Sequence, residues 1–443
     1  MVLYVDNEMK EDNDMLTNVK LGKTMRSVSI VGIGATPFFN SLENPKYKGY
    51  THGELFGYAA LDAMKDAGVE PRDVQFYYHG SANPYILDKC ITPNVQVADW
   101  FGMRGKGSVS HSEGCCTGYI ALEEAVMAVA SGMYDCVLTG GCDMGTGMPD
   151  KNNPEHFRVP LIAEVLFPDL DSIFDRAYGR YLCGGGGMNH DDWINLYRRE
   201  NNLTLEQIDD VLAHQAYHFR RAAELCPRAI KRTPYEQLAK EAGYDDVWEY
   251  FKSPYNPKMT QYLRTASDSC VADGAACCLV VPTEEAYKYT DKPVEVLAIG
   301  ASVLDAIVPH LEKKATAEAA RQVFEQTGLT ADDMDLVMVN DFIGSSAFLA
   351  AEEIGYLPKG EGWKYVLEGR IAYDGDKPVN TNGGRTSYGH AFGASGMADV
   401  FEAVTQMRGE AGERQVKKQP KYTFLRGFGG SQNVRAIILK ANF

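Results

Sequence analysis

The sequence predicts an α/β protein built from two copies of one βαβαβ-type unit, and three features of the chain favour this fold class. Buried strands alternate with helices: residues 27–36 are typical of a buried strand with glycines toward its end, and residues 53–68 follow as an amphipathic helix that ends in a glycine. The same order of segments returns after residue 290. A central helix in each part is rich in Ala and Gly, which permits two helix backbones to approach closely.

An internal repeat is the most specific of these features. Ile-Val-Gly-Ile-Gly-Ala-Thr at residues 30–36 aligns with Val-Leu-Ala-Ile-Gly-Ala-Ser at residues 296–302. A duplication of about 120 to 150 residues per half is the simplest explanation, because self-similarity in one order along the chain indicates repeated structural units. Three further pairs of segments align in the same order: residues 73–79 with 333–341, 111–132 with 393–409, and 137–141 with 423–430.

The duplication divides the chain into domains. Residues 145–265 change in character, with proline-rich patches, four consecutive glycines and several helical segments, so we expect an inserted subdomain of loops and helices. Two halves packed with their central helices face to face would bury both helices. The predicted organisation is a polar N-terminal extension at residues 1–25, a first half at 26–144 and 266–290, the insert at 145–265, and a second half at 291–443.

The composition excludes several classes of function. The chain of 443 residues carries a net charge of −16, which argues against binding to nucleic acids or anionic membranes, because such ligands require clustered Lys and Arg. Ten cysteines without a CxxC pair indicate a reducing, cytoplasmic compartment. The sequence contains neither an apolar run long enough to span a membrane nor a spacing typical of metal ligands, so we expect a soluble protein without a metal.

The stretch His111-Ser-Glu-Gly-Cys-Cys-Thr-Gly118 carries the candidate nucleophile. A helical run follows at once, so Cys115 should lie at a helix N-terminus, where the helix dipole favours the thiolate. The alternative is that Cys115 and Cys116 are small buried hydrophobic residues at a tight packing point. The duplicated architecture brings His390 of the second half close to Cys115, which favours the reactive thiol, since an imidazole takes up a thiol proton near neutral pH.

These residues resemble the motifs of the thiolase superfamily. Cys115-Cys-Thr-Gly is similar to its Cys-x-Ser-Gly nucleophile motif, and Gly389-His390-Ala-Phe-Gly-Ala-Ser-Gly396 is similar to Gly-His-Pro-x-Gly-x-(Ser/Thr)-Gly. The resemblance covers roughly residues 26–443 and is closest to the sterol-carrier-protein-x-like branch. It implies a five-layer α-β-α-β-α sandwich of two βαβαβαββ-type halves, with CoA esters as substrates. Members of that branch sometimes work with a zinc-ribbon/OB-fold companion protein.

The same resemblance implies a role for each motif residue. Cys115 corresponds to the acylated nucleophile, and His390 to the residue that activates it and helps to bind the thioester oxygen. Asn340 falls on the position that holds a water in one oxyanion hole, although a strand-end cap is the alternative for this side chain. The backbone N–H of Gly429 would form the other oxyanion hole with that of Cys115. CoA is then a co-substrate, no cofactor stays permanently bound, and a homodimer through the sheet edge of the first half is expected.

Four further residues are candidates for binding the substrate or CoA. Phe392 and Ser395 lie within the histidine motif. Arg220 and Arg221 belong to the densest basic cluster of an otherwise acidic chain, which could clamp a phosphorylated ligand. The alternative for this cluster is a solvated helix face.

The chain departs from the thiolase pattern at three positions. Gly427 stands where ordinary thiolases have the second catalytic cysteine, which shuttles the α-proton; Phe342 stands at the alternative cysteine of the His-Asp-Cys-Phe variant, and Ala391 replaces the motif proline. The motifs therefore support a cysteine nucleophile, but they do not supply the acid/base that moves the α-proton. Four side chains near the expected site could replace it, and the sequence does not rank them: His79, His111, Tyr388 and Asp341.

Three hypotheses for the function follow. The first is an acyltransferase that cleaves or forms a β-ketoacyl-CoA through acyl-Cys115, with a substrate whose α-carbon is already acidified, such as a benzoylsuccinyl-CoA. The second keeps the fold and changes the reaction, to C-acylation of an electron-rich aromatic or to retro-aldol cleavage of a β-hydroxyacyl-CoA. The third is a non-catalytic scaffold subunit, which the retention of both Cys115 and His390 disfavours.

Overall fold

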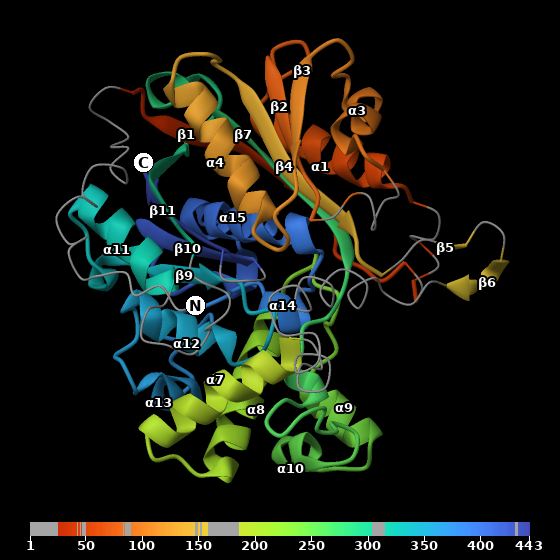
Figure 1. The fold of residues 1–443 in the computed structure, drawn as a ribbon, viewed down its shortest axis with the longest axis vertical. Coiled ribbons are helices and arrows are strands. Elements are labelled where there is room, and N and C mark those ends of the chain that lie inside the picture. Colours follow the sequence, from red (N-terminus) through yellow and green to blue (C-terminus); the bar gives the residue numbers. More distant parts are fainter. Residues whose placement is uncertain are drawn as a thin grey trace, which may run out of the picture.

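The computed structural model describes most of the chain (Figure 1). The predicted N-terminal extension, except Met25, and residues 158–185 of the predicted insert lie outside the described part. The described residues are 25–41, 43–44, 46, 50–82, 84, 90–146, 149–150, 153–157, 186–303, 315–429 and 433–443.

Within these residues, nine strands form one sheet in the order β3-β2-β4-β7-β1-β8-β11-β10-β9, and a separate hairpin joins β5 to β6. The first part of the chain contributes β1 (Val28–Ala35), β2 (Phe76–Gly80), β3 (Gly107–His111), β4 (Val137–Met144), β5 (Pro149–Asp150), β6 (Asn153–Phe157) and β7 (Asp273–Pro282). The second part contributes β8 (Val294–Val303), β9 (Leu336–Val339), β10 (Tyr422–Gly429) and β11 (Asn433–Ala441).

The strand pairing repeats between the two parts. From β1, the neighbours β7 and β4 pair antiparallel and β2 then pairs parallel to β4. From β8, the neighbours β11 and β10 pair antiparallel and β9 then pairs parallel to β10. The two half-sheets meet along one edge through Ser29 with Glu295 and Ile30 with Val294. The structure thus confirms the duplicated α/β fold that the repeat predicts.

Helices and half-sheets stack in five layers (Figure 1). Alternate residues of a strand pack into different cores, as period-two alternation requires: Met338 faces the central helices, and its neighbours Val337 and Val339 face the outer helices. The helices of these layers are α1 (His52–Asp66) on the first half-sheet, α4 (Thr117–Ala130) and α15 (Phe392–Arg408) between the half-sheets, and α11 (Ala315–Thr327) with α12 (Ser346–Ile354) on the second.

The two central helices approach each other closely at their first turns. A Cβ built on Gly118 of α4 would lie 2.4 Å from the carbonyl oxygen of Gly393 in α15. No side chain fits at that distance, so the contact requires glycine. This approach brings the N-terminal end of α4, with Cys115, beside the N-terminal end of α15, with His390.

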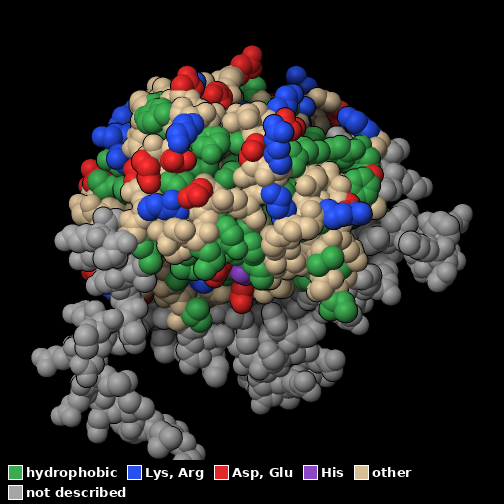
Figure 2. All heavy atoms as spheres, turned by 90° about the horizontal axis from the view of Figure 1, so that it is seen from above, with side chains coloured by type: hydrophobic (Ala, Val, Ile, Leu, Met, Phe, Trp, Pro, Cys, Tyr) green, Lys and Arg blue, Asp and Glu red, His purple; other side chains and the backbone are tan. Residues whose placement is uncertain are grey.

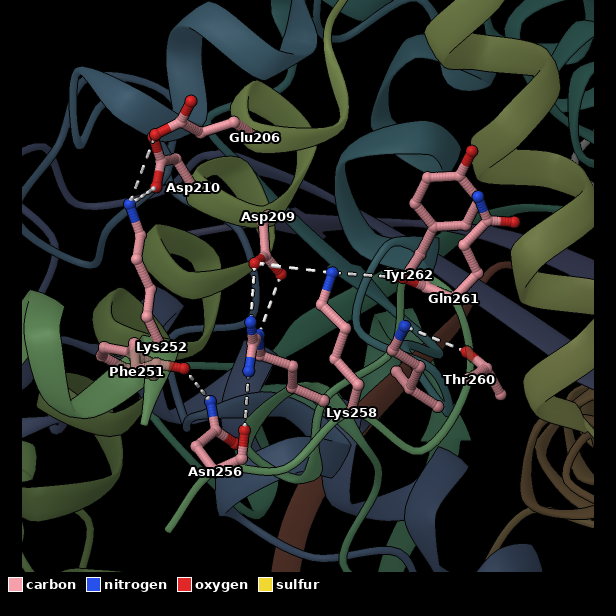
Figure 3. Close-up of polar contacts among 12 residues, drawn as sticks. Glu206, Asp209, Asp210, Phe251, Lys252, Asn256, Lys258, Thr260, Gln261 and Tyr262 are labelled. Atoms are coloured by element: carbon pink, nitrogen blue, oxygen red, sulfur yellow. Dashed lines mark hydrogen bonds and ion pairs between the residues drawn. The ribbon is translucent and has the colours of Figure 1, made fainter. Parts of the chain in front are cut away.

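The insert supplies helices that pack on the second half. Helix α8 begins at a capping box, in which Thr204 and Gln207 satisfy each other's backbone N–H groups. Asp209 of this helix forms an ion pair with Lys258, drawn in Figure 3. It also binds the guanidinium of Arg264 at 2.8 Å, which ties the loop after α10 to α8. The helices concerned are α7 (Gly186–Glu200), α8 (Leu205–Glu224), α9 (Tyr235–Glu241) and α10 (Val247–Lys252).

The remaining helices are short. None of the described helices combines the length and the apolar character that a membrane span requires. On the face shown in Figure 2, acidic and basic side chains are interspersed among apolar ones. The short helices are α3 (Pro93–Val97), α13 (Gly362–Leu367), α14 (Gly384–Ser387), and the 3₁₀ turns η3 (Ala98–Phe101), η4 (Thr265–Ser267), η5 (Thr283–Lys288), η6 (Ala331–Asp333) and η7 (Gly412–Arg414).

Candidate active site

A tight turn before α4 presents Cys115. The hydroxyl of Thr117, the first residue of the helix, donates to the carbonyl oxygen of Gly114 at 2.7 Å and accepts from the backbone N–H of Glu113 at 2.8 Å. Gly114 itself has a positive φ of 55°, a conformation that glycine adopts without strain. Thr117 therefore closes the turn around the cysteine and fixes its backbone.

His390 comes to this turn from the other half of the chain. Its backbone N–H donates to the carbonyl oxygen of Cys270 at 2.6 Å, and its carbonyl accepts from Ala272 at 3.0 Å, so the segment before β7 holds it like a strand. The Nε2 atom lies 3.2 Å from Sγ of Cys115, and Nδ1 lies 3.1 Å from the hydroxyl of Ser395. The network favours the tautomer in which Nδ1–H donates to Ser395, because Nε2 is then free to accept the thiol proton.

Burial sets the protonation of this pair. It raises the pKa of the Cys115 thiol to about 12, more than the charge of Arg385 lowers it. It also lowers the pKa of His390 well below the usual range of histidine, and Arg385 lowers that pKa further. The resting site therefore holds a neutral thiol and a neutral imidazole. Burial thus opposes the thiolate that the helix end was expected to favour.

Asp143 is a site residue that the sequence did not single out. It follows the apolar run of β4 and is completely buried. Its carboxylate accepts from the hydroxyl of Ser81 at 2.6 Å and from the backbone N–H groups of Ala82 and Gly393, the latter at 2.6 Å. Asp143 thereby anchors the first turn of α15 to the first half-sheet, and with it the segment that carries His390. A lone acidic residue at the end of a buried strand was the available signal.

Asn340 and Gly429 lie where strands β9 and β10 end. The side chain of Asn340 donates to the carbonyl oxygen of Phe428 at 2.7 Å and accepts from the N–H of Phe342 at 3.0 Å, which is the geometry of a strand-end cap. A Cβ built on Gly429 would lie 3.3 Å from Cβ of Cys116, so this glycine adjoins the turn that carries Cys115 and Cys116. The oxyanion-hole roles of both residues stay predictions.

Gly427 lies under an aromatic ring. A Cβ built on it would lie 2.5 Å from Cδ2 of Tyr119. The hydroxyl of Tyr119 donates to Asp399 at 2.5 Å, and Asp399 forms a buried ion pair with Arg385 at 2.6 Å. Tyr119 is thus held in place, and the position offers no room for a cysteine side chain.

Comparison with known proteins identifies the family. A model of the thiolase C-terminal domain-like family matches residues 306–441. An acetyl-CoA acetyltransferase of Methanothermobacter thermautotrophicus is 31% identical over 411 residues, which cover 89% of this chain and 94% of that protein. The chain belongs to the thiolase superfamily. It is an enzyme of the thiolase type, an acyl-CoA acyltransferase.

Two further relatives of this thiolase show lower identity. Benzoylsuccinyl-CoA thiolase subunit BbsB of Thauera aromatica is 26% identical over 93% of this chain and 97% of its own length. Sterol carrier protein 2 of Bos taurus is 26% identical over 88% of this chain and 68% of its own length. Among solved structures, an Ltp2-ChsH2(DUF35) aldolase superposes with a TM-score of 0.71 at 20% identity, covering 94% of this chain and 98% of that one, which shows the shared fold.

One of the four candidate acid/base residues shares a charged neighbour with Cys115 and His390. The charge of Arg385 contributes to the pKa of Asp341 and also to those of Cys115 and His390. The other three candidates contact other rings. His79 lies against His52 in the outer layer, His111 stacks on Tyr78, and Tyr388 packs on Phe38.

The four candidate binding residues fall into two pairs. Ser395 and Phe392 lie at His390, whose ring centroid is 5.0 Å from that of Phe392. Arg220 is buried, where it donates to Ser387 and Thr233 and stacks on Tyr235, and Arg221 forms an ion pair with Asp374 at 2.9 Å. Both arginines are engaged within the thiolase, and their contact with CoA stays a prediction.

Among the described residues, no cluster of His, Cys, Asp or Glu is arranged to hold a metal ion.

Proposed function

We propose that this thiolase cleaves or forms a β-ketoacyl-CoA through an acyl group on Cys115 and exchanges that acyl group with CoA. The observation that carries the proposal is the 3.2 Å contact between Sγ of Cys115 and Nε2 of His390, with both side chains buried. A soft nucleophile beside a neutral base is the combination that acyl transfer from a thioester requires.

In the cleavage direction, the thiol proton moves from Sγ of Cys115 to Nε2 of His390, and the sulfur attacks the β-carbonyl carbon. The carbonyl oxygen becomes negative, and backbone N–H groups at Cys115 and Gly429 would stabilise it; removal of one such donor typically costs about 2.7 to 4 kcal/mol. The bond between the α- and β-carbons then breaks and leaves acyl-Cys115 and a carbanion on the CoA product. The thiol of a second CoA attacks the acyl group and regenerates the cysteine.

Mass spectrometry after incubation with acetyl-CoA tests this proposal. The acetyl group should be found on Cys115, and Cys115→Ala should remove it. Cys116→Ala is the matched control, because Cys116 is also buried and next in the chain, whereas within the described residues the histidine contact belongs to Cys115. An acetyl group on another residue, or on none, would falsify the proposed nucleophile. Thiolysis assays with a panel of aliphatic and aromatic β-ketoacyl-CoAs then define the acyl group.

The proposal extends to assembly. The names of two similar proteins refer to a thiolase subunit and to a complex with a DUF35 protein, and we extend that arrangement to this chain as a companion subunit. A homodimer through β3 is also proposed, since β3 is an edge strand and the nearby Val95, Trp100 and Val109 are exposed apolar residues. Purification from the native host shows whether a companion co-purifies, and light scattering of the isolated chain gives its oligomeric state.

A further inference from the structure

Carbon–carbon cleavage leaves a carbanion on the α-carbon, and a protein group has to deliver a proton to it. Neither Gly427 nor Phe342 can do so, because neither side chain carries an exchangeable proton. We propose that Asp341 is the acid/base that protonates and deprotonates the α-carbon of the substrate. This inference rests on the proposed function and names the group that completes it.

The carboxyl of Asp341 is buried, and only one of its two oxygens accepts a hydrogen bond from the described residues. Its Oδ1 accepts from the backbone N–H of Arg385 at 2.9 Å, whereas Oδ2 has no hydrogen-bond partner among the described residues. A buried carboxyl oxygen without a partner is costly, and such an atom in an active site indicates a place for substrate or water. Gly384 permits this arrangement, since a Cβ there would lie 2.2 Å from Oδ2.

The position of Asp341 in the fold connects it to the nucleophile. It directly follows Asn340 at the carboxyl end of β9, and the amide of Asn340 bonds to Phe428 at the end of β10. The next residue, Gly429, adjoins the turn of Cys115 and Cys116. The carboxyl ends of parallel strands meet at one edge of a sheet, where α/β proteins bind ligands.

Two other buried carboxylates of this region, Asp399 and Asp143, accept hydrogen bonds with both oxygens. Asp399 binds the guanidinium of Arg385 with both oxygens and also accepts from Tyr119. Both oxygens of Asp143 accept backbone N–H groups. Asp341 therefore differs from them in having an oxygen available for a reacting proton.

The charge balance around Asp341 allows both protonation states at neutral pH. Burial raises its pKa to about 7, and the negative charge of Asp399 acts in the same direction. The guanidinium of Arg385 and its backbone N–H oppose this rise. A group that gains and loses a proton in one catalytic cycle works best when its pKa lies near the working pH.

The step balances in both directions. In cleavage, the electron pair of the broken carbon–carbon bond takes the proton from the carboxylic acid of Asp341, which becomes a carboxylate. The incoming CoA thiol returns a proton to the site when its sulfur attacks acyl-Cys115. In synthesis, the carboxylate of Asp341 removes the α-proton of an acyl-CoA, and the resulting carbanion attacks acyl-Cys115 and displaces the sulfur.

Two measurements on Asp341→Asn separate this inference from the proposed function. Exchange of α-hydrogen for deuterium in acetyl-CoA and propionyl-CoA should fall by about 100-fold or more, the usual contribution of a general base. Acylation of Cys115 by the same thioesters needs no α-proton and should stay within about threefold of wild type. Asp268→Asn is the matched control, because Asp268 is another carboxyl whose pKa is raised by burial, and its exchange rate should not change.

Loss of acylation in the variant, or exchange at the wild-type rate, would overturn the role of Asp341. Absence of acylation in the wild type would instead overturn the proposed function. The wild-type protein gives a readout that does not depend on the folding of a variant. Its exchange rate should rise with pH and level off above a pKa near 7, as the carboxylate forms, and a flat profile between pH 5.5 and 8.5 would contradict the assignment.

Discussion

The ring of Tyr119 occupies the space into which a side chain at Gly427 would project, with only 2.5 Å between Cδ2 of the ring and a Cβ built on the glycine. Tyr119 belongs to α4 and Gly427 to β10, so the contact joins a central helix to the second half-sheet. The hydrogen bond from Tyr119 to Asp399 prevents the ring from turning away. The second cysteine of ordinary thiolases and this tyrosine are therefore mutually exclusive in the observed packing.

Gly427→Cys should accordingly destabilise the protein. Overpacking of a buried site typically costs about 1 to 3 kcal/mol of unfolding free energy, and urea denaturation measures it. In a Tyr119→Ala background the same cysteine should cost less, because the ring that it strikes is gone, so the two substitutions are not additive. An unchanged unfolding free energy for Gly427→Cys alone would show that the ring yields easily.

Ser395→Ala tests the support of His390. Ser395 is the hydrogen-bond partner of Nδ1, which fixes the ring with Nε2 toward the thiol. Loss of about 1 kcal/mol from this hydrogen bond corresponds to a roughly fivefold slower acylation of Cys115 in a rapid-quench experiment. Ser395→Thr keeps a hydroxyl at the same atom and should retain most of the rate. Equal rates for the Ala variant and wild type would assign no role to this contact.

The repeat and the Cys115–His390 pair could be predicted from the sequence because each depends on local patterns. Apolar strands, a glycine-rich helix and two short motifs are visible along the chain, and the order of the halves brings them together. The obstruction of Gly427 by Tyr119 could not be predicted, since it depends on the separation between a helix and a strand distant in sequence. The neutral resting state also escaped prediction, because desolvation depends on tertiary packing. The role of Asp143 could not be predicted either, because its contact with Gly393 joins two segments that are distant in sequence.

Asp143→Asn should weaken the junction of the two halves. The carboxylate accepts from Ser81, Ala82 and Gly393, whereas an amide has one acceptor oxygen and places an NH₂ group against a backbone donor. Loss of charge-assisted hydrogen bonds of this kind costs about 1.5 to 3 kcal/mol, to be measured by urea denaturation. Acylation of Cys115 should also slow, since the start of α15 is released.

The control for this change is Asp99→Asn, an exposed carboxylate paired with Arg104 on the surface. Its denaturation midpoint should equal that of wild type, because exposed ion pairs contribute little to stability. Equal midpoints for Asp143→Asn and Asp99→Asn would mean that the contacts of Asp143 do not hold the helix.

Acid should destabilise the fold through buried histidines, and His218 offers the clearest test. Burial lowers its pKa to about 4, although its Nε2 lies 3.1 Å from the carbonyl oxygen of Val366. Between pH 6.5 and pH 4 the unfolded chain therefore binds a proton that the folded chain excludes. The stability contributed by the neutral ring is complete above pH 6.5 and is lost as the pH falls toward 4.

His218→Gln removes this titration and keeps a donor for Val366. From pH 6.5 to pH 5, wild type should lose about 2 kcal/mol more unfolding free energy than the variant, since one pKa unit corresponds to about 1.4 kcal/mol. Above pH 7 the two pH dependences should run parallel, which serves as the internal control and removes the contributions of the carboxyl groups common to both proteins. Parallel curves throughout the acid range would mean that His218 takes up its proton without unfolding, through a local opening between α8 and the segment that carries Val366.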